Sequence, residues 1–174
     1  SVSQNQVAYY VKDTGKITGT DIGSIKGYGV GVYLDGGTLD ALSPTLDYTA
    51  TGNSGNGIIG LLLKGNTNIS GYTRKIKVGN TAGTNYAIAM YADGQGTSGT
   101  AKNISAALET GENGVGLFAE NGSNINYTGQ MAIGNGAKAG TAIYIGNNNG
   151  TNPSTVTIGS GANIVLKGEN GVGA

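Results

Sequence analysis

The chain has 174 residues, of which 10 are basic and 10 acidic, and it contains neither cysteine nor histidine. The zero net charge gives no electrostatic footprint for nucleic acid or for an anionic membrane surface. The two missing residue types exclude disulfides, Ser-His-Asp and Cys-His nucleophiles, and zinc sites that depend on those ligands.

One strand-like phrase recurs along the chain from end to end. Its copies occupy residues 7–11, 30–34, 59–63, 88–92, 115–119 and 141–145, and a seventh begins at residue 172. We call it the anchor phrase after its small residue, which is Ala8, Gly31, Gly60, Ala89, Gly116, Ala142 and Gly173 in turn. Successive spacings are 23, 29, 29, 27, 26 and 31 residues. Such a period indicates a solenoid, propeller or array in which each repeat buries its apolar face on its neighbours.

Each repeat holds two further short runs. An alternating apolar run that ends near glycine lies at residues 22–27, 76–79, 131–134 and 164–168, with weaker copies at 46–48 and 108–111. A shorter piece carries Asn-Ile at residues 68–69, 103–104 and 124–125, with Val156 and Ile158 as its late counterpart. Alternation indicates strands, and the glycine and asparagine residues between the runs suit turns.

Together these runs predict an all-β parallel β-helix, or solenoid, of about six coils of 23–31 residues with short loops. Glycine accounts for 34 residues without the period of collagen, and the 37% hydrophobic content favours an ordered, turn-rich chain. Residues 93–101 and 147–153 are predicted to be loops. We expect residues 1–174 to be a single segment of a longer array without caps, able to self-associate through its ends.

Alternation also assigns the two faces of the anchor phrase. We expect aliphatic residues such as Val30, Val32 and Leu34 to point inward together, and the small residue and the ring after it to point outward. The rings are the candidate binding residues: Tyr10, Tyr33, Tyr91, Phe118 and Tyr144, with Leu62 interrupting the series. They form either a structural stack, which is preferred because solenoids stack like residues, or a flat strip that binds a sugar or a partner protein.

Three motif-like patterns are interpreted as features of the repeat. Gly94-Gln-Gly96-Thr-Ser-Gly99, with Glu120 about twenty residues on, imitates a dinucleotide-binding fingerprint, but the strands around it are copies of the repeat. Asp35-Gly36-Gly37 and Asp93-Gly94 are isolated pieces of a calcium-binding repeat and indicate turns. The basic run at residues 74–77 is interpreted as strand-edge charge. The sequence therefore predicts no catalytic residue, cofactor or metal site.

The recurring anchor phrase, the apolar runs that end in glycine, and the Asn-Gly connectors resemble the passenger regions of type V autotransporters. The likeness is closest to the large Gly/Asn-rich outer-membrane adhesins of the fusobacterial type, and it covers essentially the whole chain. The resemblance implies a right-handed parallel β-helix rod, anchored at a bacterial outer membrane or secreted, with a role in adhesion and virulence. It implies a protein or glycan receptor on a host cell or another bacterium, and no membrane insertion within this segment.

Two functions from different classes stay open. The leading expectation is a non-enzymatic stalk or adhesin segment that displays binding surfaces. The alternative is a carbohydrate-active β-helix enzyme, a polysaccharide lyase or glycosidase. It predicts that at least three of Asp35, Asp40, Asp93, Glu120 and their neighbours converge in one groove, since such chemistry needs clustered carboxylates.

Overall fold

The computed structural model describes most of the chain. The described residues are 7–19, 24–26, 29–41, 45–49, 58–69, 72, 74–79, 87–94, 101–136, 138, 140–147 and 152–173, with backbone only for 24, 40–41 and 45–49. Within them every regular element is a β-strand, and there is no helix that could cross a membrane.

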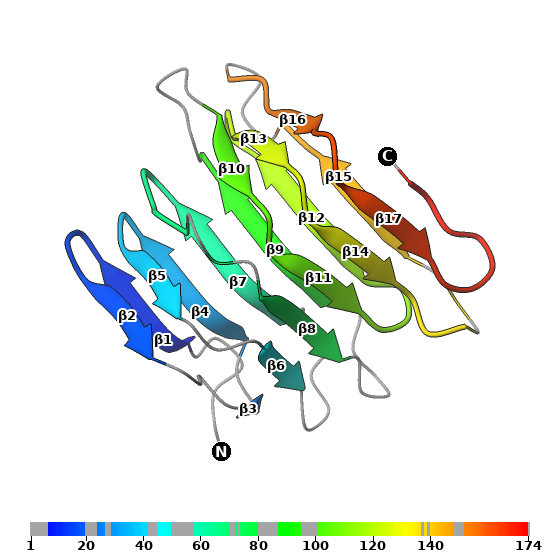
Figure 1. The fold of residues 1–174 in the computed structure, drawn as a ribbon, viewed down its shortest axis with the longest axis horizontal. Helices are drawn as coiled ribbons and strands as arrows, with labels where there is room; N and C mark the ends of the chain where they lie inside the picture. The colour runs from blue at the N-terminus through cyan, green and yellow to red at the C-terminus, as the bar shows by residue number, and fades with distance from the viewer. Residues whose placement is uncertain are drawn as a thin grey trace.

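Two six-stranded parallel sheets form the body of the molecule. We call the first the anchor sheet; it contains β1 (Val7–Lys12), β4 (Val30–Asp35), β7 (Ile58–Lys64), β9 (Ala87–Asp93), β12 (Val115–Glu120) and β15 (Thr141–Ile145). The second, the opposite sheet, contains β3 (Ser24–Lys26), β6 (Thr45–Thr49), β8 (Lys75–Gly79), β11 (Ala107–Thr110), β14 (Gln130–Ile133) and β17 (Asn163–Leu166). Figure 1 shows them as two layers, with the colour advancing strand by strand from one end to the other.

Shorter strands connect the two layers. β2 (Lys16–Gly19) pairs with β5 (Thr38–Ala41), and β13 (Asn124–Tyr127) lies between β10 (Lys102–Ile104) and β16 (Thr155–Ile158). Neighbouring strands in every sheet come from consecutive repeats and run parallel, so the chain forms a β-solenoid, as the repeat predicts. A dinucleotide-binding fingerprint would need a helix after Gly99, but residues 101–109 contribute β10 and β11 instead.

The register of the anchor sheet confirms the alignment of the repeats. Val7 pairs with Val30, and the same row continues through Ile59, Ile88, Val115 and Thr141 to an isolated bridge with Val172. The opposite sheet is also in the predicted register, and its weak copies at 46–48 and 108–111 are strands. Equivalent positions in consecutive repeats therefore stack directly on one another.

The third run is aligned differently from the prediction. Asn103 pairs with Asn126 and Ile104 with Tyr127, so the Asn-Ile pieces at 103–104 and 124–125 are displaced by two residues. The reason is packing: the displacement brings Tyr127 into the core, where its side chain is fully buried. Because side chains alternate with a period of two, the shift still leaves Ile104 and Ile125 pointing inward.

Aliphatic rows fill the space between the sheets. On the anchor sheet Val32, Leu34, Leu61, Leu63, Met90 and Leu117 are each at most 1% exposed, and Ile76, Val78, Leu108, Met131 and Ile133 face them from the opposite sheet. Burial of one such side chain contributes about 1.5–3 kcal/mol. These rows confirm the predicted filling of a narrow solenoid.

The predicted alternation is wrong at the small residue of the anchor phrase. Ala89 and Ala142 are fully buried, and a Cβ on Gly60 would lie 2.7 Å from Val78 Cγ2 in the core. The next residue along each strand also points inward, so the strand bends at this point. Only a small residue fits, because a Cβ on Gly116 would come within 2.6 Å of the Ala142 carbonyl oxygen. The bend turns the preceding residue, such as Ile59, to the outer face.

Strands of the anchor sheet end in a left-handed residue. Asp13, Gly36, Gly65, Gly94 and Asn121 follow β1, β4, β7, β9 and β12, and all have φ between 54° and 78°. The Asp35-Gly36 and Asp93-Gly94 pieces are therefore turns, as predicted. Within the two predicted loops, residues 95–100 and 148–151 lie outside the described residues, as does most of the Gly94–Gly99 pattern.

Candidate functional site

The five candidate rings lie in one row along the outside of the anchor sheet. The Cα pairing runs Tyr10, Tyr33, Leu62, Tyr91, Phe118 and Tyr144. In each strand the small residue of the anchor phrase and the residue after it both point inward. The ring is the next residue along the strand, and it points outward. The row is continuous in the strand pairing, and Leu62 divides it into one pair and one group of three.

The rings do not form a flat platform. Ring centroids lie 4.9 Å apart for Tyr10 and Tyr33, 5.0 Å for Tyr91 and Phe118, and 4.6 Å for Phe118 and Tyr144. Phe118 therefore lies between two rings, which leaves little of its face for a ligand. At the two ends of the row the situation differs, because Tyr10 is 52% exposed and Tyr144 is 49% exposed.

The bend in the strands creates a groove beside the rings. Because two successive residues of each strand point inward, the outer face of the sheet has a gap between its outward side chains. One side of the gap is formed by Ile59, Ile88 and Val115, which we call the aliphatic wall. The rings of Tyr91, Phe118 and Tyr144 form the other side. The groove has a volume of about 510 Å³, and its lining consists of Ile59, Ile88, Tyr91, Val115, Phe118, Glu120 and Tyr144. It is therefore apolar except for one carboxylate and the tyrosine hydroxyls.

A row of charged residues runs along the other side of the rings. Lys12, Asp35, Lys64, Asp93 and Glu120 pair in that order at the ends of their strands. The Tyr10 hydroxyl donates to Asp35 Oδ2 at 2.9 Å, and the Tyr91 hydroxyl donates to Glu120 Oε1. The contact with Asp35 raises the pKa of Tyr10 above its ordinary value. Glu120 is 6% exposed, so Tyr91 supports a carboxylate that is nearly withdrawn from solvent.

The acidic residues of the enzyme alternative are partly brought together. Asp93 and Glu120 lie on neighbouring strands, and the side-chain amide of Asn121 donates to Asp93 Oδ1 at 2.6 Å. Lys64 separates Asp35 from this pair, and the side chain of Asp40 is outside the described residues. Among the described residues, no group of three or more Asp and Glu side chains could hold a metal ion.

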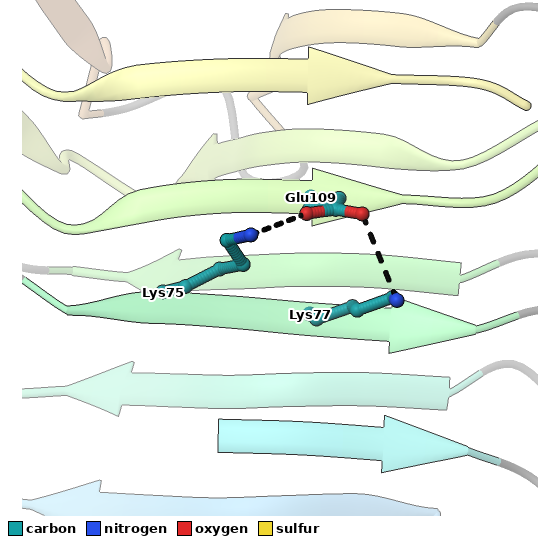
Figure 2. Close-up of polar contacts among 3 residues, drawn as sticks. All are labelled: Lys75, Lys77 and Glu109. Carbon is teal, nitrogen blue, oxygen red and sulfur yellow. Dashed lines mark ion pairs between the residues drawn. The ribbon is translucent and has the colours of Figure 1, made fainter. Parts of the chain in front are cut away.

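The basic run at 74–77 is not at a sheet edge. Its strand, β8, lies between β6 and β11, so the interpretation as edge charge is wrong. Figure 2 shows Lys75 and Lys77 on β8 on either side of Glu109 on β11, with Nζ–O distances of 3.0 and 3.7 Å. Burial alone would raise the pKa of Glu109, but the hydrogen bond with Lys75 and the charges of Lys75, Lys77 and Lys167 together lower it. The lysines neutralise a central carboxylate instead of protecting an edge.

Sequence reasoning identified the rings but missed their polar partners and the aliphatic wall. A signal for the partners was present, because an acid follows the ring by two residues in Tyr33-Leu-Asp35, Tyr91-Ala-Asp93 and Phe118-Ala-Glu120. No comparable signal marked Ile59, Ile88 and Val115, because strict alternation assigns them to the core. Comparison with protein-family models, curated proteins and solved structures finds no match to the chain.

Proposed function

We propose that the chain is a non-enzymatic segment of a surface-exposed autotransporter passenger, built as a right-handed parallel β-helix of about six coils. In this proposal it acts as a stalk and adhesin segment on a bacterial surface. The observation that carries the proposal is the groove of the anchor sheet, which follows the rod across four strands and is lined by Ile59, Ile88, Val115 and three rings. Concave, mostly apolar sites with a few polar groups are the usual form of ligand sites.

The chemistry of the groove favours a glycan receptor. A sugar ring offers an apolar C–H face to the aliphatic wall and to ring edges, and hydroxyl donors to Glu120 and to the tyrosine hydroxyls. Low net charge supports contact-driven binding in place of electrostatic steering. Because the middle rings cover each other, Tyr144 supplies the most accessible of the three ring faces in the groove.

The test compares two double variants on a glycan array and on host cells. Tyr91→Ala with Phe118→Ala removes two rings from the groove, and Tyr10→Ala with Tyr33→Ala removes two rings from the same row outside it. We expect a loss of binding of at least tenfold in the first variant only, with β-rich circular dichroism retained in both. Equal loss in both variants, or none in either, contradicts the proposal.

A third variant protects this test against loss of folding. Val115→Lys places a longer, charged side chain in the groove without removing a ring. Val115 lies on the outer face, where a lysine can reach solvent. It should reduce binding as strongly as loss of the rings. Binding that is unchanged by Val115→Lys removes the groove from the proposal, and binding to protein receptors but not to glycans changes the receptor class.

The second candidate is a polysaccharide lyase or glycosidase, favoured by the adjacent carboxylates of Asp93 and Glu120. It predicts cleavage of a polysaccharide by the purified chain, lost in Glu120→Gln and in Asp93→Asn. Binding without cleavage favours the adhesin proposal, and cleavage that disappears in either carboxylate variant favours the enzyme.

A further inference from the structure

The groove of the anchor sheet contains a single strongly polar side chain. Among the described residues that line it, Glu120 is the only Asp, Glu, Lys or Arg, and the others are aliphatic or aromatic. Glu120 follows Phe118 by two residues on β12, so it lies on the outer face, beyond the ring row. The lining therefore presents a carboxylate to a ligand and no basic group.

The two oxygens of the Glu120 carboxylate face different neighbours. Oε1 accepts the hydrogen bond from the Tyr91 hydroxyl on β9. Oε2 lies on the side of β15, because a Cβ placed on Gly146 would be 3.8 Å from it. The same Cβ would be 3.1 Å from Cε1 of Tyr144. Since glycine has no side chain, a space lies above Gly146 between Oε2 and the ring of Tyr144.

This space is a break in the row of charged residues. Ile145 pairs with Ala119, so Gly146 takes the next position, beside Glu120, where the preceding strands carry long charged side chains. A side chain at residue 146 would fill the space, and glycine does not. Side chains of β12 and β15 bound it on the outer face of the sheet, and no strand edge takes part.

We propose that the groove selects amino sugars, glycan units that carry a free ammonium group, and that Glu120 is the specificity-determining residue. The ammonium group lies in the space above Gly146 and donates to Glu120 Oε2. The sugar ring that carries it packs beside Tyr144, and the neighbouring units of the glycan contact the aliphatic wall. This selectivity rests on the proposed function of the groove as a glycan site.

Charge complementarity favours an ammonium group over the other substituents of sugars. A hydrogen bond between two ionised groups is roughly twice as strong as one between neutral groups. Glu120 is 6% exposed, so water screens its attraction for a cation less than at an open surface. An acetylated nitrogen or a hydroxyl brings no charge to Oε2, and a sugar carboxylate is repelled.

The size of the groove makes a sugar chain the ligand in preference to a small amine. Its lining comes from the four consecutive strands β7, β9, β12 and β15. With neighbouring strands about 4.8 Å apart, the groove is about 14 Å long. Its volume of about 510 Å³ lies within the usual range of ligand sites. An oligosaccharide therefore contacts the wall along its length while one unit places its ammonium group at Glu120.

The experiment uses three β-1,4-linked hexamers that differ only at C2: glucosamine, N-acetylglucosamine and glucose. Calorimetry at a mildly acidic pH that keeps the amines protonated gives their affinities. The wild-type chain should bind the glucosamine hexamer at least about tenfold more tightly than the other two. In Glu120→Gln this ratio should fall below about twofold. Asp35→Asn removes a carboxylate from the same charged row outside the groove, and the ratio should stay as in wild type.

A second variant, Gly146→Ala, covers the case in which Glu120→Gln does not fold. It puts a methyl group into the space without changing any charge, and its closest contact is the outward side chain of Tyr144. The ratio should fall at least about threefold, with β-rich circular dichroism retained. Equal wild-type affinities for the three hexamers, or a ratio that persists in Glu120→Gln or in Gly146→Ala, overturn the selectivity and leave the proposed glycan site standing. Wild-type protein that binds none of the hexamers also overturns the selectivity, and the glycan array then decides the proposed function separately.

Discussion

The hydroxyl of Tyr91 on β9 donates a hydrogen bond to the carboxylate of Glu120 on the neighbouring strand β12. Tyr10 on β1 makes the same contact with Asp35 on β4. In both cases the acid lies two residues after the ring position of its own strand, so one sequence relationship produces the contact at both places. The two contacts differ in burial. The contact between Tyr91 and Glu120 is partly buried, and Glu120 is only 6% exposed, whereas the contact between Tyr10 and Asp35 is exposed.

This difference predicts unequal effects of removing the hydroxyl. Tyr91→Phe deprives a buried carboxylate of a donor and should lower the free energy of unfolding by about 1–3 kcal/mol. Tyr10→Phe, the matched control, leaves Asp35 in contact with water and should change it by less than about 0.5 kcal/mol. Urea denaturation of both variants measures the effect. Equal losses would show that the Tyr91 contact has no special role.

The buried tyrosines Tyr127 and Tyr72 form a second matched pair. The Tyr127 hydroxyl lies 2.9 Å from both the Ala106 and Gln130 carbonyl oxygens, and the Tyr72 hydroxyl has no hydrogen-bond partner within the described part of the chain. Tyr127→Phe should therefore destabilise the fold by about 1–1.5 kcal/mol. Tyr72→Phe removes an unsatisfied buried polar group and should leave stability unchanged or raise it. Thermal unfolding of the two variants checks the order, and a loss in Tyr72→Phe as large as that in Tyr127→Phe would contradict it.

Alkaline pH should destabilise the protein through Tyr72. Burial raises the pKa of Tyr72 to about 12, although the charge of Arg74 opposes the shift. A raised pKa means that the folded state favours the neutral phenol, so stability is intact below the unfolded value near 10 and falls as the pH rises toward 12. The loss from this residue is about 2–3 kcal/mol. Denaturation curves between pH 9 and 12 should fall less steeply in Tyr72→Phe, and identical slopes would contradict this assignment.

Adjacent leucines on β7 test the two faces of the anchor sheet. Leu61 is fully buried, and Leu62 lies in the outward ring row. Leu61→Ala should cost about 2–5 kcal/mol through lost burial and a cavity. For Leu62→Ala we expect less than about 1.5 kcal/mol, because only partial burial is lost. Chemical denaturation gives both values, and a larger loss at Leu62 would contradict the orientation of the strand.

The ion pairs of Glu109 should be sensitive to acid and to salt. Its lowered pKa means that the carboxylate contributes stability above the ordinary value of 4.5, and this contribution is lost as the pH falls through the folded value. Glu109 is partly exposed, so Glu109→Gln should cost only about 0.2–1 kcal/mol at pH 7. The difference from wild type should disappear as the pH falls below the folded pKa of Glu109, and it should shrink in 1 M salt. Glu169→Gln, at an exposed carboxylate, is the control and should have no effect.

Much of the solenoid could be predicted because its repeats are similar in sequence. The row from Val7 to Thr141 and the ring row from Tyr10 to Tyr144 were both predicted correctly from spacing alone. The Asn-Ile alignment was wrong by two residues, because only packing shows that Tyr127, and not Ile125, lies opposite Ile104. Of the candidate site, the rings were predicted, and the groove beside them was not.

The sequence by itself determined which residues stack in the two six-stranded sheets, because parallel strands from consecutive repeats place equivalent positions side by side. The tertiary structure alone decided where each side chain points at the bend. Gly60 and Leu61 both point inward, and the strand can bend in this way because Gly60 has no Cβ. The opposite sheet and the carbonyl of Ala89 leave no room for one. A period of two cannot reveal this, since it assumes a straight strand. The bend moves Ile59, Ile88 and Val115 outward, and the groove exists for that reason.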